Sequence, residues 1–150
     1  MMIAIIVIEV LAILANIGLP FYQNMALKMK AADIAREMQQ VGTAAESSRE
    51  RTGTWPDERA AGIAPPELAS FLPAGFTFAR QDYQLDWEHW TLAESPAMDA
   101  AQDDFAGITV VTRDPRLAAT VAAELREGEV RFTLGNRTTL VVAEPSSAER

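Results

Sequence analysis

The side chains that could do chemistry in this chain are few. The only histidine is His89, which lies between Trp87 and Trp90 in an alternating stretch. No serine or acid stands at a spacing from it that is typical of a catalytic triad, so a packing or surface role is favoured. The absence of cysteine excludes thiol catalysis and disulfides. Glycine-rich nucleotide loops and nucleophile elbows are also missing. The sequence therefore predicts that the protein is not an enzyme.

A second group of candidates is acidic. Asp99, Asp103 and Asp104 follow Glu94 in a polar stretch that reads as a loop over 94–106. Ca²⁺ takes several oxygen ligands from a compact loop, and these carboxylates are of the right type. The strict acidic alternation and the glycine of the EF-hand loop are missing. A solvated loop with no cofactor is favoured, and a calcium site is the alternative.

The remaining polar candidates lie in the first 19 residues, where Glu9 and Asn16 are surrounded only by Met, Ile, Ala, Val, Leu and Gly. About 20 apolar residues span a bilayer, so we expect a membrane helix over 1–22. A carboxylate there costs roughly 2.5–3.5 kcal/mol on insertion scales. Glu9 is therefore expected to be protonated or to pair with a positive group on another chain. Asn16 is expected to hydrogen-bond between helices.

A second helical pattern, amphipathic this time, continues over 23–52. Its apolar stripe recurs at helical spacing and comprises Leu27, Ala31, Ile34, Met38, Val41 and Ala45. Gly53 is a natural stop for the helix. Gly18 and Pro20 lie at the join of the two halves and should kink or loosen the helix there.

Residues 53–150 read as a head domain. We expect a short helix over 65–72 and strands at 83–92 and 108–112. A second helix begins at Pro115, capped by Asp114, and runs to Gly128. A hairpin follows, with strands at 129–134 and 138–143. The predicted fold class is α+β: a long N-terminal helix packed against a small, mostly antiparallel sheet with one or two extra helices.

The net charge of −8 is carried entirely by the head domain, because residues 1–51 hold five basic and five acidic residues. A surface of this sign repels phosphate, so nucleic acid is not an expected partner.

Several features of residues 1–56 occur together in one known superfamily. The apolar run holds Ile8-Glu9-Val10 and closes on Gly18-Leu19-Pro20-Phe21-Tyr22, and the amphipathic helix leads to Gly53-Thr54-Trp55-Pro56. This order resembles the type IV pilins and type II secretion pseudopilins. The resemblance implies a single-pass protein of the bacterial inner membrane with a periplasmic head. It also implies homologous subunits, a methylating prepilin peptidase and an assembly platform with its ATPase as partners. An acid in the segment would set register against a neighbour's amino terminus.

The position of the family's glutamate can be aligned in two ways. Family precursors carry a basic leader ending in Gly, followed by Phe-Thr-Leu-Ile-Glu, and neither is present here. If Glu9 is that glutamate, cleavage follows Ala4, and only ten residues separate Glu9 from Pro20. If Pro20 is the family proline, the leader and the glutamate lie upstream of Met1 and Glu9 is an additional acid. The second alignment is preferred because it restores the length of the segment.

The predicted function is that of a structural subunit, a pilin or pseudopilin and more specifically a minor one, in a type IV pilus-like or type II secretion filament. The alternative is a single-pass, membrane-tethered periplasmic binding or accessory module. The sustained apolar stripe over 23–52 favours the first, since a tether needs only a flexible linker.

Overall fold

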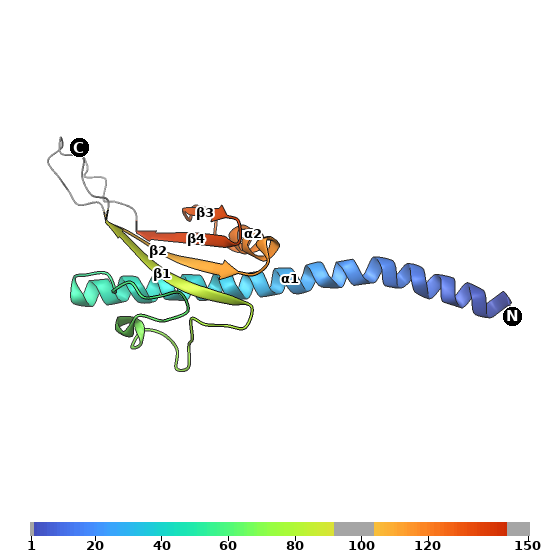
Figure 1. Ribbon diagram of the computed structural model, residues 1–150, viewed down its shortest axis with the longest axis horizontal. Coiled ribbons are helices and arrows are strands. Elements are labelled where there is room, and N and C mark those ends of the chain that lie inside the picture. The colour runs from blue at the N-terminus through green and yellow to red at the C-terminus, as the bar shows by residue number, and fades with distance from the viewer. Residues whose placement is uncertain (1, 92–103, 144–150) are drawn as a thin grey trace, which may run out of the picture.

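One helix runs through the first third of the molecule. The computed structural model describes residues 2–91 and 104–143, with side chains described for most positions from 18 onward. Helix α1, Met2–Thr52, is 51 residues long. It passes Pro20 without a break, and Figure 1 shows only a gentle curve along this half. The helix ends as predicted at Gly53, whose φ of +81° is a conformation that glycine adopts without strain.

The head domain contains one antiparallel sheet. Its strands are β1 (Tyr83–Thr91), β2 (Asp104–Thr112), β3 (Arg131–Leu134) and β4 (Arg137–Ala143). They lie in the order β1-β2-β4-β3. The predicted four-stranded antiparallel sheet is confirmed. Strand β2 begins at Asp104 rather than Ile108, because residues 104–107 pair with the second half of β1.

The shorter helices begin where the sequence predicts them. Helix α2, Pro115–Glu124, has Asp114 as its N-cap, and the Arg116 backbone N–H donates to its carboxylate at 2.9 Å. The helix ends at Glu124, with Leu125 as its C-cap, before the predicted stop at Gly128. The element expected over 65–72 is only a 3-10 turn, η1 (Pro66–Leu68). These two predictions were too long because the chain turns before the local stop signals.

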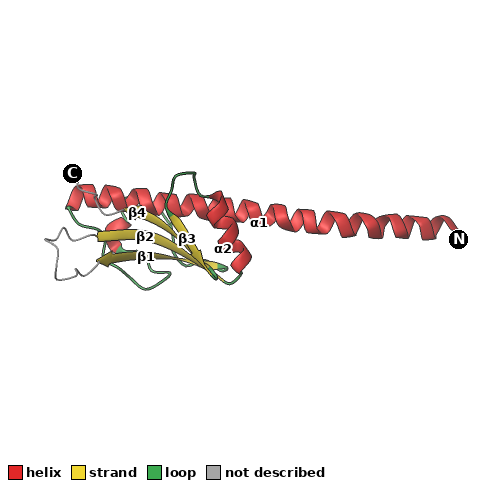
Figure 2. Cartoon of the chain, turned by 90° about the horizontal axis from the view of Figure 1, so that it is seen from above, coloured by secondary structure: helices red, strands yellow, loops and turns green. Residues whose placement is uncertain are grey.

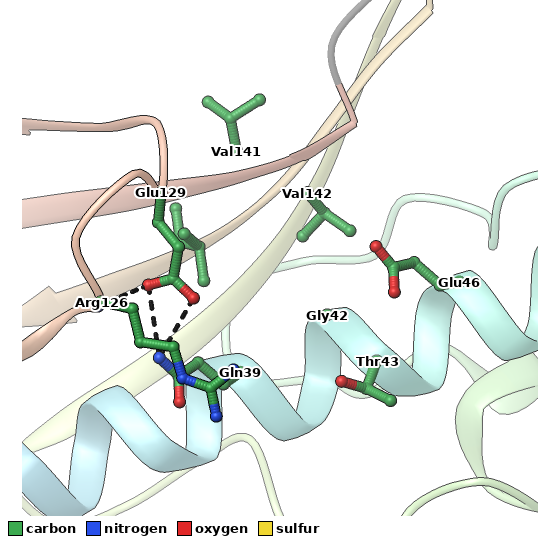
Figure 3. Close-up of a pocket in the computed structure, with 9 residues that line it drawn as sticks. Gln39, Gly42, Thr43, Glu46, Arg126, Glu129, Val141 and Val142 are labelled. Carbon is green, nitrogen blue, oxygen red and sulfur yellow. Dashed lines mark hydrogen bonds between the residues drawn. The ribbon is translucent and has the colours of Figure 1, made fainter.

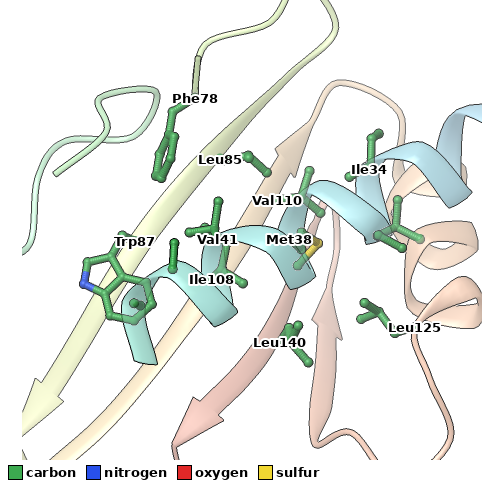
Figure 4. Packing of buried hydrophobic residues seen from close by; sticks show 14 of the residues in the cluster. Ile34, Met38, Val41, Phe78, Leu85, Trp87, Ile108, Val110, Leu125 and Leu140 are labelled. Atoms are coloured by element: carbon green, nitrogen blue, oxygen red, sulfur yellow. The ribbon is translucent and has the colours of Figure 1, made fainter. Parts of the chain in front are cut away.

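The core lies between α1 and the sheet. The predicted stripe on α1 is buried from Ala31 to Ala45 and packs against Leu85 and Trp87 of β1 and Ile108 and Val110 of β2 (Figure 4). Helix α2 covers the end of this core with Leu117, Val121 and Leu125. Figure 2 shows the sheet lying along the distal half of α1 only. The α+β fold and the packing of the sheet on this half of the helix are confirmed.

Candidate functional site

The acidic residues proposed for calcium are not brought into a described site. Asp99 and Asp103 lie outside the described residues, and Asp104 is the first residue of β2, with an undescribed side chain. Among the described residues there is no group of three or more His, Cys, Asp or Glu placed to hold a metal ion. The calcium alternative therefore stays a prediction about the stretch before β2.

The aromatic residues around His89 divide between the two faces of β1 as the alternation predicts. Trp87 lies in the core with 1 % of its surface exposed. Trp90 lies on the outer face, half-buried beside Gly107, where an added Cβ would come within 3.2 Å of the Trp90 ring. His89 is half-buried in β1 opposite Ala106. The surroundings of His89 are thus those of packed side chains rather than of a catalytic site.

A cleft with polar walls lies between α1 and β4. Figure 3 shows this cleft of about 250 Å³, with Gln39 and Glu46 on α1 and Arg126, Glu129 and Val142 around the opposite rim. Gln39 Nε2 donates to both Glu129 carboxylate oxygens, at 3.1 and 3.3 Å. The Arg126 backbone N–H donates to Glu129 Oε2 at 2.7 Å. These bonds fasten the α2–β3 loop to α1, which gives the cleft a structural role.

A polar cluster on the outer face of the sheet was missed by the sequence reading. Arg137 of β4 pairs with Asp86 at 3.2 Å and with Glu88 at 3.6 Å. Burial raises the pKa of Asp86, the negative charge of Glu88 raises it further, and Arg137 opposes both. Thr109 and Thr139 extend the cluster with a hydrogen bond of 2.7 Å between their hydroxyls. The only sign of this cluster in the sequence was that polar residues such as Asp86 and Glu88 alternate with the core-facing residues of the strand.

The turn after α1 ties the end of the helix to the sheet. The ring centroids of Trp55 and Trp87 are 5.9 Å apart. Trp87 Nε1 donates to the carbonyl oxygen of Pro56 at 3.0 Å. The guanidinium of Arg49 lies 4.5 Å from the centroid of the Trp55 ring. The Gly-x-Trp-Pro stretch singled out in the sequence thus holds the end of α1 against β1.

Polar contacts hold the opposite end of β1 to α1. Lys30 forms an ion pair with Asp82. Glu37 accepts a hydrogen bond from Tyr83 Oη at 2.7 Å and pairs with Arg80 at 3.1 Å. Burial raises the pKa of Tyr83, and the hydrogen bond to Glu37 adds to the effect. The head is therefore fixed to α1 at both ends of the contact.

Among the side chains that the structure describes, those of the N-terminal half of α1 make no such polar contacts with the head. This half projects beyond the domain (Figure 1). Asn16, Gly18 and Pro20 are exposed on it, whereas Glu9 lies on the helix with an undescribed side chain. Large apolar side chains that are half exposed or more follow the same stretch: Ile13, Leu19, Phe21, Tyr22, Met25 and Met29.

Helical geometry places three of these exposed residues on one side. At about 100° per residue, Tyr22, Met25 and Met29 point away from the direction taken by the buried stripe that starts at Ala31. Tyr22 is 72 % and Met29 67 % exposed. The helix is therefore apolar on two sides around its midpoint, and the head covers one of them.

Comparisons of the chain with family models, with curated proteins and with solved structures found no match. In the described residues, no helix is both long and apolar enough to cross a membrane.

Proposed function

We propose that this chain is a structural subunit, a pilin or pseudopilin and specifically a minor one, of a type IV pilus-like or type II secretion filament, assembled through its N-terminal helix. The observation that carries the proposal is the form of α1. α1 is one uninterrupted helix of 51 residues. The small head packs along its C-terminal half, and its N-terminal half extends beyond the head.

The projecting half is unsuited to water by itself. Tyr22, Met25 and Met29 are each more than half exposed and follow one side of the helix at i, i+3 and i+7 spacing. Contiguous exposed apolar surface marks a site for protein or lipid contact. Packing against the same helix of other subunits would cover the apolar sides that the head leaves open.

The membrane part of the proposal rests on the sequence of residues 1–19 alone. In it, the subunit is held in a bacterial inner membrane with its head in the periplasm, and then moves into the filament. The resemblance supplies a prepilin peptidase and an assembly platform with its ATPase as partners. Asn16 would hydrogen-bond between helices, and Gly18 and Pro20 would adapt the helix to its neighbours. Glu9 would pair with a positive group of an adjacent subunit.

The test is recovery of the chain in filaments sheared from its native host. We expect the chain in the sheared fraction, and we expect Met25→Glu to lower its amount about tenfold, because a buried unpaired charge at a helix interface costs 1.4 kcal/mol or more. Ile63→Glu is the matched control, since Ile63 is also an exposed apolar residue but lies in the head.

The total cellular amount of both variants should equal that of the wild type. Recovery of the wild-type chain only as a membrane monomer would overturn the filament proposal and favour the tethered periplasmic module. Equal loss of both variants from the sheared fraction would show that the α1 surface has no special part in assembly.

A further inference from the structure

Strand β3 is an open edge of the sheet. It is the last strand in the order β1-β2-β4-β3, and all four of its residues are exposed. In Figure 1 it lies at the margin of the sheet farthest from β1, and no described strand lies beside it on the side away from β4. Val130, Phe132 and Leu134 are 46, 53 and 79 % exposed. Edge strands are usually protected by charge, proline or a covering segment, and an exposed apolar edge is a template for pairing.

The other edge of the sheet is covered at the start of β1. On β1, the Leu85 carbonyl accepts from Gly62 N–H at 2.8 Å, and Leu85 N–H donates to the Phe78 carbonyl at 2.9 Å. The Tyr83 carbonyl accepts from Arg80 N–H at 3.0 Å. The preceding loop thus occupies the outer backbone groups at the start of β1. The two edges therefore differ: a loop of this chain is hydrogen-bonded to the start of β1, whereas the outer side of β3 is open.

The hairpin register fixes which backbone groups of β3 face outward. Leu134 is paired with Arg137 next to a two-residue turn, and Phe132 with Thr139. The Val141 N–H donates to the Val130 carbonyl at 2.9 Å. Hydrogen-bonded pairs alternate with non-hydrogen-bonded pairs in an antiparallel ladder, so residues 130, 132 and 134 bond inward to β4. The N–H and C=O groups of Arg131 and Thr133 therefore point to the open edge.

We propose that β3 is an interaction surface for β3 of a second copy of this chain, paired antiparallel about a two-fold axis at Phe132. In this register Arg131 of one copy faces Thr133 of the other, and the reverse. Two outward residues on each strand then exchange both of their bonds, which makes four hydrogen bonds across the axis. The two sheets become one continuous sheet.

The same register brings the exposed apolar side chains together. Phe132 stands opposite the second copy's Phe132 as a non-hydrogen-bonded pair, the arrangement in which side chains lie closest. Val130 stands opposite Leu134 on both sides of it. All three share the outer face of the sheet because they are two residues apart. A self-complementary apolar row of this kind suits a second copy better than an unrelated peptide.

Neighbouring registers are less favourable. Moving the axis to Arg131 puts two arginines directly opposite each other, which is destabilising. Moving it to Thr133 takes the outward groups of Arg131 beyond the second strand's end and leaves Val130 without an apolar partner. The observations therefore select one register, and this pairing does not depend on the filament proposal.

Disulfide trapping tests the register, because the chain has no cysteine of its own. In full-length protein under mild oxidation, Phe132→Cys should form a covalent dimer. Its two Cα atoms would be about 4.5 Å apart, within the roughly 4.4–6.8 Å that a disulfide spans. Leu134→Cys is the control, since Leu134 is more exposed but would lie about 14 Å from its counterpart.

We expect about tenfold more dimer from Phe132→Cys than from Leu134→Cys, because pairing holds the thiols at a high effective concentration. Val130→Cys mixed with a differently tagged Leu134→Cys should give the mixed dimer. More dimer from Leu134→Cys than from Phe132→Cys would indicate random collision and overturn the proposal. So would the absence of dimer from Phe132→Cys, the result expected if an extended segment of another protein occupies the edge.

A backbone variant gives an independent readout. Thr133→Pro removes an outward N–H and leaves the β3–β4 ladder bonds in place, as edge strands tolerate. Combined with Phe132→Cys, it should reduce the trapped dimer about tenfold, because the intermolecular pairing loses hydrogen bonds and proline fits a paired strand poorly. An unchanged dimer yield in this double variant would exclude β-pairing as the contact.

Discussion

At the scale of single residues, Asp86 has the most consequential environment. Asp86 is 8 % exposed, and its pKa is raised first by burial and then by Glu88. The folded state therefore binds this proton more tightly than the unfolded chain does. At pH values above the raised pKa, the ionised carboxylate of Asp86 lowers the free energy of unfolding. This penalty disappears as the pH falls through that value.

We expect Asp86→Asn to remove this pH dependence. Relative to the variant, the wild type should gain stability as the pH falls from 7 toward the ordinary value of 3.8. Urea unfolding between pH 4 and 7 measures the difference, and parallel profiles would contradict the expectation. Asp114→Asn should give the opposite sign in profiles extended below pH 3.8, because hydrogen bonds from Arg116 lower the pKa of Asp114 and its stabilising effect is lost only below the ordinary value.

Local residue roles could be read from the sequence, and distant ones could not. Asp114 was identified as a cap because its acceptor and the Arg116 donor are two residues apart. The pairing of Asp86 with Arg137 joins residues 51 positions apart and depends on the order of three strands. Nothing in a single sequence fixes that order.

At the scale of elements, Gly42 lets α1 lie close to β4. A Cβ placed there would lie 3.2 Å from Val142 Cγ2. We expect Gly42→Leu to push the helix from the strand and to lower the free energy of unfolding by about 1–3 kcal/mol. Urea unfolding checks this, and Val142→Ala in the same chain should restore part of the loss. Gly18→Leu is the control, since nothing lies within 4 Å of its added Cβ.

The helices were easier to predict than the sheet edges. The stripe from Ala31 to Ala45 has a period that only a helix buries on one side, so both its existence and its partner face followed from the sequence. The strand over 129–134 was predicted, but its position at the edge of the sheet was not. Val130, Phe132 and Leu134 are exposed because β3 is an edge strand and only the other face of the sheet packs on α1 and α2.

At the scale of the whole molecule, the core begins well after the N-terminus. None of the described core residues precedes Ala31, and Leu27 is the first that packs against them. We expect a chain without residues 1–22 to keep its cooperative urea unfolding and its near-ultraviolet circular dichroism from the buried tryptophans. A chain without residues 1–35 should lose both, because it lacks Ala31, Ile34 and Ala35. Loss of cooperativity in the shorter deletion would contradict this division of the helix.

The placement of the head along α1 also has a mechanical consequence. The contacts between α1 and the head, from the Lys30–Asp82 ion pair to the Trp55–Trp87 ring contact, are arranged in a row parallel to the helix axis. A pull on the N-terminal end along that axis loads these contacts together, as a shear. A pull across the axis would open them one after another. Resistance to force is set by the unfolding rate, so the chain should withstand far greater tension along α1 than across it.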